Sequence, residues 1–169
     1  MLTVSNTSPL IFLAKVPELI ALLKWKYDKI IIPKEVYAEA VEKGISSHNP
    51  QISSNAAKIK ALVEEGFIKV EIVKTKIALP SYLGKGESAA IALALERKVK
   101  GVLIDEKPAT SVARSLGLNP SPISTLPIEA FRKDKISRAE AVKILDSLLA
   151  NNYYLSSRDY KILMKMLEL

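Results

Sequence analysis

The sequence has no cysteine and only one histidine, and these absences exclude several kinds of functional site. Without cysteine, the chain has no disulfide, no thiolate zinc site and no cysteine nucleophile. With His48 alone, it has neither a histidine-rich zinc site nor an HExxH motif. His48 lies in the polar segment 44–50, which is typical of a solvated loop, so we expect no catalytic role for it.

Long apolar runs are also missing from the sequence. None reaches the roughly 18 residues of a transmembrane helix, and the first residues lack the basic region and the cleavage site of a signal peptide. We therefore expect a cytoplasmic protein without a membrane segment. Of the 169 residues, 49% are hydrophobic, which excludes global disorder and suits one ordinary domain. Abundant Lys, Glu and Ile without cysteine also favour a thermophile.

Hydrophobic patterning predicts that strands and helices alternate along the chain. A loop is expected at residues 44–54, followed by a helix at 56–65 that ends at Gly66. The alternation predicts an α/β fold with a central parallel sheet flanked by helices on both faces. Strands are expected at residues 2–6, 29–33, 68–73, 101–105 and 119–124. The run at 101–105 is continuously apolar up to Asp105, as in a buried strand, whereas 68–73 alternates like a strand at an edge.

Domain organisation is expected to be simple, because no repeat, low-complexity tract or linker divides the chain. Residues 1–169 are predicted to form a single domain, with residues 137–169 as an appended helical part. Ser137 and Glu140 have the spacing of a capping box, which predicts a helix start there.

The net charge of the chain and the charge of its candidate site residues have opposite signs. The net charge is +7, yet the positions that could carry chemistry are acidic. This combination suits a protein that holds an anionic polymer on a basic surface and cuts it at carboxylates with a metal ion. The alternative is that the excess lysines only keep the protein soluble.

Two expected strands end in oxygen-bearing side chains. Asn6 follows the strand at 2–6, and Asp105 ends the strand at 101–105. In open α/β sheets, ligands bind beyond the carboxyl ends of the strands. If these strands are neighbours, their oxygen donors converge and a hard cation becomes plausible. Alternatively, Asp105 caps the helix that follows it.

Two glutamates on helices complete the set of candidates. Glu87 lies in the first turn of an apolar helix, where the helix dipole favours a carboxylate. It follows Gly84 and Gly86, which we interpret as a tight entry into that helix, since the P-loop spacing is missing. Glu39 lies on the helix after the second central strand. Both also fit an ordinary helix-surface charge.

Four segments resemble, in matching order, the motifs of PIN-domain proteins. Residues 4–11 resemble their opening strand, acidic residue, Thr or Ser, and apolar helix. Residues 32–39 resemble the P-x-x-V-x-x-E segment, and residues 86–94 the G-E-x-x-A-I-x-L-A helix. Residues 103–107 resemble the start of the L-x-D-D-x-x-A strand and helix. The chain is most similar to the VapC-like branch, which includes uncharacterised nucleic-acid-binding PIN proteins.

The resemblance implies a Mg²⁺- or Mn²⁺-dependent ribonuclease, and many members of the family are toxins blocked by a small antitoxin. Carried over by position, the catalytic metal ligands would be Asn6, Glu39, Glu87 and Asp105. Possible auxiliary residues are Thr125 and Glu106. The chain departs from the family pattern in three ways: Asn6 stands in place of the usual first aspartate, Glu106 in place of a second Asp, and Thr110 where an arginine is often found.

The leading hypothesis is therefore a metal-dependent endoribonuclease that hydrolyses RNA phosphodiester bonds. Candidates to hold the RNA backbone are Lys85, Lys107 and Lys34. The alternative is a catalytically weak or inactive PIN scaffold that binds RNA or a protein partner. Apolar stretches at residues 10–23 and 162–167 predict a homodimer or an antitoxin complex, unless they pack within the monomer.

Overall fold

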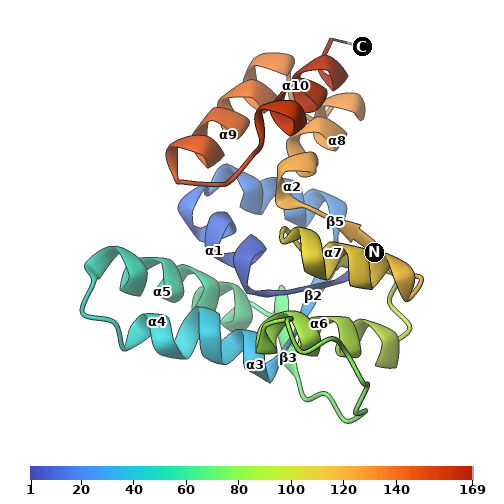
Figure 1. Ribbon diagram of the computed structural model, residues 1–169. Helices are drawn as coiled ribbons and strands as arrows, with labels where there is room; N and C mark the ends of the chain where they lie inside the picture. The colour runs from blue at the N-terminus through green and yellow to red at the C-terminus, as the bar shows by residue number, and fades with distance from the viewer. Residues whose placement is uncertain (169) are drawn as a thin grey trace.

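A five-stranded, all-parallel sheet forms the centre of the molecule in the computed structural model, which describes residues 1–168 (Figure 1). The predicted α/β class with a central parallel sheet is confirmed. The spatial order is β3-β2-β1-β4-β5, so β3 lies at one edge. The strands are β1 (Leu2–Ser5), β2 (Lys29–Pro33), β3 (Ile68–Glu71), β4 (Gly101–Leu103) and β5 (Asn119–Ser121).

Helices connect the strands and cover both faces of the sheet (Figure 1). The helices before β4 are α1 (Thr7–Lys15), α2 (Glu18–Lys26), α3 (Lys34–Tyr37), the π-helical turn η1 (Ala38–Glu42), α4 (Lys43–Ile45), α5 (Pro50–Glu64) and α6 (Lys85–Glu96). Those after β4 are α7 (Lys107–Ser115), the 3-10 turn η2 (Ile123–Thr125), α8 (Leu126–Arg132), α9 (Arg138–Ala150) and α10 (Ser157–Met166). No helix within residues 1–168 combines the length and apolar character that crossing a membrane requires.

Side chains alternate across the sheet and separate two hydrophobic cores. Ile30 and Ile32 of β2 point into a core shared with α1, α2, α5, α8 and α9, whereas Ile31 points into a core shared with α6 and α7. Successive side chains of a strand point to opposite faces, so a buried strand must be apolar on both. The run Ile30-Ile31-Ile32 meets that requirement.

The C-terminal helices share the larger core. Ile144 and Leu145 of α9 and Leu163 of α10 are buried in the same cluster as Leu10 and Leu13 of α1. Leu169, the last residue of the predicted domain, lies outside the described residues. Most of the apolar stretch at residues 10–23 is also buried within this monomer.

Helix α5 begins earlier than the sequence predicted. The prediction placed a loop at residues 44–54, but helix α5 starts at Pro50. Asn49 caps it, because its Oδ1 accepts hydrogen bonds from the N–H groups of Gln51 (2.9 Å) and Ile52 (3.3 Å). Proline at the first helical position adds a preset backbone angle. The polar first turn misled the prediction because it is exposed, so hydrophobic periodicity begins only further along.

A shared core predicts that the C-terminal helices unfold together with the sheet. Leu145 is 1% exposed, whereas Leu149 on the same helix is 37% exposed. We expect Leu145→Ala to lower the free energy of unfolding by about 2–5 kcal/mol, and Leu149→Ala, the matched control, to change it little. Denaturant unfolding followed by circular dichroism should show one shifted transition for the whole chain. A separate C-terminal transition in Leu145→Ala would show instead that these helices are an independent appendage.

Candidate functional site

Asn6 and Glu106 meet beyond the carboxyl ends of β1 and β4. These strands are paired neighbours, and the backbone N–H of Asn6 extends the pairing by donating to the carbonyl of Leu103 at 3.2 Å. The Asn6 side chain then donates from Nδ2 to Oε2 of Glu106 at 2.8 Å. The convergence expected at this edge of the sheet therefore exists, with Glu106 as the acidic partner.

Glu39 lies close to Asn6 and belongs to the segment that follows β2, the other neighbour of β1. It lies in the π-helical turn η1, between α3 and α4. Single π-helical turns inside α-helices are often found at functional sites, because the extra residue redirects a side chain. Thr7, at the start of α1, donates from Oγ1 to Oε2 of Glu39 at 2.6 Å and fixes the direction of the carboxylate.

Glu87 comes from the first turn of α6, and its neighbouring glycines explain the position of this helix. The N–H of Gly84 donates to Oε2 of Glu87 at 3.0 Å. A Cβ atom at Gly86 would lie 2.6 Å from Oε2 of Glu39 and 3.0 Å from Oγ1 of Thr7. Glycine at this position therefore lets α6 approach the other two helices, which is the physical basis of the tight entry expected from the sequence.

These side chains enclose a cavity of about 130 Å³, which we call the acid cavity. Burial raises the pKa of Glu87 above its ordinary value, and the charges of Glu106 and Glu39 raise it further, while the N–H of Gly84 acts in the opposite direction. The cavity is lined by Asn6, Thr7, Ser8, Glu39, Gly84, Gly86, Glu87 and Glu106, with no Lys or Arg among these residues. The carboxylates thus face one another without a compensating side-chain cation.

Asn6 adds an unsatisfied oxygen to this arrangement. The residue is 2% exposed, and its Oδ1 is the one buried side-chain oxygen or nitrogen in residues 1–168 that has no hydrogen-bond partner. Buried polar atoms without a partner are rare, and each calls for an explanation such as an ion or a water molecule. A carbonyl oxygen among carboxylates is the donor chemistry that Mg²⁺ and Mn²⁺ prefer.

The acidic side chains, however, lie too far apart to hold a metal ion in their present positions. Within residues 1–168, no three His, Cys, Asp or Glu side chains stand close enough together to hold a metal ion as they lie. The donor types and the unsatisfied oxygen therefore fit a hard cation, and the carboxylates would have to draw together to bind it.

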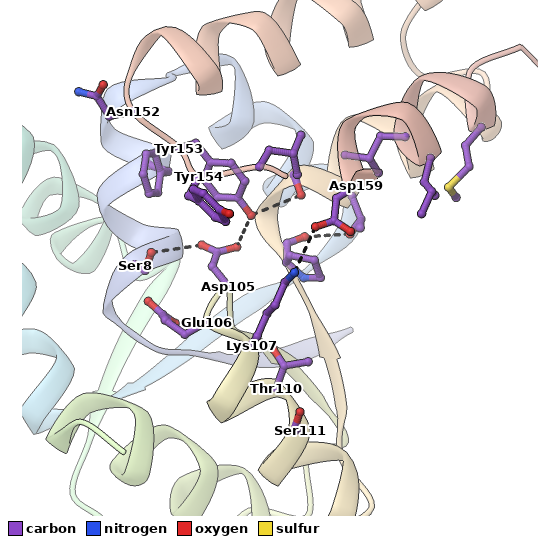
Figure 2. A pocket seen from close by; sticks show the side chains of 18 of the residues that line it. Ser8, Asp105, Glu106, Lys107, Thr110, Ser111, Asn152, Tyr153, Tyr154 and Asp159 are labelled. Carbon is purple, nitrogen blue, oxygen red and sulfur yellow. Dashed lines mark hydrogen bonds and ion pairs between the residues drawn. The ribbon is translucent and has the colours of Figure 1, made fainter. Parts of the chain in front are cut away.

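Asp105 points away from the acid cavity and into a larger one (Figure 2). Its Oδ1 accepts from the N–H of Ile123 and from the hydroxyl of Tyr153, each at 2.8 Å, and its Oδ2 accepts from Ser8 at 3.4 Å. Burial raises the pKa of Asp105 to about 6, although these hydrogen bonds act to lower it. The alternative role for Asp105, capping of the next helix, is excluded, because Glu106 occupies the N-cap position of α7.

The larger cavity, which we call the large pocket, has a volume of about 830 Å³ and lies between α7 and α10. Thr125 lines it and donates to the carbonyl of Pro122 at 2.8 Å. Lys107 also lines it and pairs with Asp159 at 3.4 Å. Lys34 and Lys85 are exposed and line neither cavity.

Of the four predicted ligands, the structure brings Asn6, Glu39 and Glu87 to one cavity and places Glu106 there in the position expected for Asp105. The alternation of side chains along the strand explains why Asp105 and Glu106 point in opposite directions. Leu103 faces the larger core and Ile104 the core beneath α6, so Asp105 and Glu106 continue to alternate. Thr7 and Tyr153 were missed, and for Tyr153 the sequence offers no signal, because it is 48 residues away from Asp105 along the chain.

Comparison with known proteins gives one match. A family model described as a PIN domain matches residues 2–168, while no curated protein and no solved structure matches the chain. The match confirms the resemblance found in the four motifs, and the narrower VapC-like branch stays a prediction.

The raised pKa of Asp105 makes stability depend on pH. Between its ordinary value of 3.8 and about 6, the native state keeps a proton that the unfolded chain releases. The free energy of unfolding of the wild type, relative to Asp105→Asn, should therefore fall as pH rises through this window and stay level above it. Urea titrations of both proteins in EDTA measure this difference. A constant difference from pH 4 to pH 7 would contradict the assigned protonation.

Proposed function

Because the chain belongs to the PIN-domain family, whose members are typically nucleases, we propose that it is a metal-dependent endoribonuclease acting at the acid cavity. The observation that carries the proposal is the unpartnered, buried Oδ1 of Asn6 beside Glu39, Glu87 and Glu106. Four different segments of the chain bring oxygen donors to one small cavity. Packing alone gives no reason for such an arrangement.

The residues that would hold Mg²⁺ or Mn²⁺ are Glu39, Glu87, Glu106 and, through its amide oxygen, Asn6. A bound ion supplies positive charge that stabilises the attacked phosphate, and it makes a coordinated water more acidic. The ion would also stabilise the charged form of Glu87, whose pKa is raised by burial and, further, by the charges of Glu106 and Glu39.

The remaining residues hold these donors in place. Thr7 fixes Glu39, the backbone of Gly84 fixes Glu87, and the amide of Asn6 fixes Glu106. In this proposal Asp105 does not bind the metal ion but supports a residue that does. By accepting from Ile123 and Tyr153, it anchors the segment after β4 from which Glu106 projects. Supporting hydrogen bonds of this kind set both the affinity and the geometry of a metal site.

RNA is the substrate in this proposal. The net charge of +7 attracts a polyanion to the surface around an acidic site. Lys107 follows Glu106 in the chain, and Lys85 lies two residues before Glu87; both side chains are exposed, so both are candidates to hold the RNA backbone. Lys34, five residues before Glu39, is a further candidate to hold the RNA backbone.

Asn6 favours a second candidate function, a PIN scaffold that binds RNA and cuts it weakly or not at all. An amide oxygen brings no charge to offset a divalent cation, so metal affinity is expected to be low. A cognate antitoxin, a homodimer and a cytoplasmic location stay predictions. Much of the apolar surface that suggested a partner is buried inside the monomer, including Leu10, Leu13, Leu19 and Leu23.

Removing one carboxylate charge tests the nuclease directly. We expect Glu106→Gln and Glu39→Gln to lower Mn²⁺-dependent cleavage of single-stranded RNA about 100-fold or more, because even partners that only support a metal ligand cost 10- to 100-fold in metal affinity or activity. Glu42→Gln, an exposed change in the same π-helical turn as Glu39, is the matched control. Initial rates with and without EDTA measure the effect, and melting temperatures show whether the fold persists.

Full activity of Glu106→Gln with unchanged melting would remove Glu106 from the metal site. Equal losses in Glu39→Gln and Glu42→Gln would show that the effect is not specific to the acid cavity.

A carboxylate at position 6 tests the metal site by adding a negative charge instead of removing one. Without metal, Asn6→Asp loses the donor to Glu106 and adds a repelling charge, so we expect a lower melting temperature in EDTA. With Mn²⁺, the added charge should tighten binding about 10- to 100-fold, since a charge pair about 4 Å apart is worth roughly 4 kcal/mol at a dielectric constant near 20, before solvent screening. Titration calorimetry measures the affinity. Equal or weaker Mn²⁺ binding would place Asn6 outside the first coordination shell and favour the scaffold.

A further inference from the structure

The large pocket is a second concave site, and the function proposed for the acid cavity does not account for it. It opens between α7, α10 and the segment at residues 152–156, which crosses from α9 to α10 (Figure 2). Its volume of about 830 Å³ lies in the range of small-molecule and cofactor sites, about 300–1,000 Å³.

The large pocket adjoins the acid cavity. Ser8 and Glu106 line both of them, so no other layer of residues separates the two spaces at that point. A polymer whose phosphate lies at the acid cavity therefore has its next unit within reach of the large pocket.

Aromatic side chains dominate one wall of the large pocket. Phe12 and Tyr153 form an edge-to-face pair, with ring centroids 4.9 Å apart and planes at 84°. Tyr154 is 82% exposed although it lines the same pocket, so its ring is open to a ligand. Bases of single-stranded nucleic acids stack on such exposed rings. Ile162 and Met166 of α10 extend the apolar surface.

Along α7 the large pocket is lined by two cations, and the carboxylates of Asp105, Glu106 and Asp159 also line it. Lys107 and Arg114 are both exposed and line the pocket, with the hydroxyl groups of Thr110 and Ser111 between them in the chain. Lys107 is paired with Asp159 at 3.4 Å. Exposed pairs of this kind contribute little stability, so a phosphate can replace Asp159 as the partner of Lys107.

We infer that the large pocket is a base-binding subsite for single-stranded RNA. The base of the nucleotide beside the phosphate at the acid cavity stacks on Tyr154, and the backbone runs past Lys107 and Arg114. The inference rests on the proposed function in taking the acid cavity as the place of that phosphate. A base in a duplex is paired and stacked, so it cannot enter a concave pocket without leaving the helix. The exposed ring of Tyr154 and the cations Lys107 and Arg114 offer contacts to both a base and a phosphate, whereas an apolar protein segment would use only the ring.

The test measures binding without cleavage. The probe is a short fluorescein-labelled RNA strand of mixed sequence, titrated with the full chain in EDTA and followed by fluorescence anisotropy. Tyr154→Ala should weaken binding about tenfold, the scale of one lost base stack. Tyr82→Ala is the matched control, because Tyr82 is 68% exposed and precedes Gly84 of the acid cavity, yet lines neither cavity. The same RNA annealed to its complement should bind with little dependence on Tyr154.

A second pair of variants tests the cations along α7. Arg114→Gln should lower the slope of log affinity against log salt concentration by about 0.7, the value for one lost phosphate contact on a single strand. Arg132→Gln, an exposed change on α8 away from both cavities, should leave the slope as it is. Replacing the bases one at a time by abasic sites should reveal a position that matters to the wild type and not to Tyr154→Ala.

The outcomes separate the subsite from the nuclease. Tyr154-dependent RNA binding without Mn²⁺-dependent cleavage would support the subsite and reject the nuclease. Cleavage by the wild type, with Tyr154→Ala binding as tightly as Tyr82→Ala, would overturn the subsite and leave the nuclease standing. A co-purifying polypeptide that Tyr154→Ala releases, with unchanged RNA binding, would overturn the subsite in favour of a protein partner.

Discussion

The parallel pairing of β2, β1 and β4 is the constraint on which the candidate site depends. Parallel strands end at the same edge of a sheet, so the segments that follow them must share one small volume. Here those segments deliver Glu39 after β2, Asn6 after β1 and Glu106 after β4. Apolar residues on both faces of the strands fix the sheet between two cores, and the positions of the acids follow from that.

Bringing these acids together has an electrostatic cost that the chain offsets only in part. Burial is the main cause of the raised pKa of Glu87, and the charges of Glu106 and Glu39 raise it further. Thr7, the Gly84 backbone and the Asn6 amide each donate a hydrogen bond to one of these carboxylates. Asn6 also removes one negative charge from the cluster, yet keeps an oxygen with no partner inside it. The neutral amide lessens the repulsion among the carboxylates, whereas a carboxylate in its place would bind a cation more strongly. Stability without metal and affinity for metal therefore oppose each other at Asn6.

Much of the fold and part of the site could be predicted from the sequence, because local patterns encode them. The run Ile30-Ile31-Ile32 predicts a strand buried on both faces, and the structure has that strand. Asn6, Glu39 and Glu87 share one cavity, as the family motifs indicated. That Glu106 rather than Asp105 lines the acid cavity was not predicted, because both follow the strand directly and only the alternation of Leu103 and Ile104 assigns their directions. The partnership of Asp105 with Tyr153 depends on tertiary packing, which no local pattern encodes.

A crystal structure after soaking in Mn²⁺, with anomalous scattering to locate the ion, tests the central claim most directly. The account predicts one manganese peak inside the acid cavity, within coordination distance of Oδ1 of Asn6 and of carboxylate oxygens from Glu39, Glu87 and Glu106. It also predicts that these carboxylates then lie closer together than they do in the arrangement described above. A manganese peak beside Asp105 in the large pocket, or none in the acid cavity at saturating Mn²⁺, would contradict it.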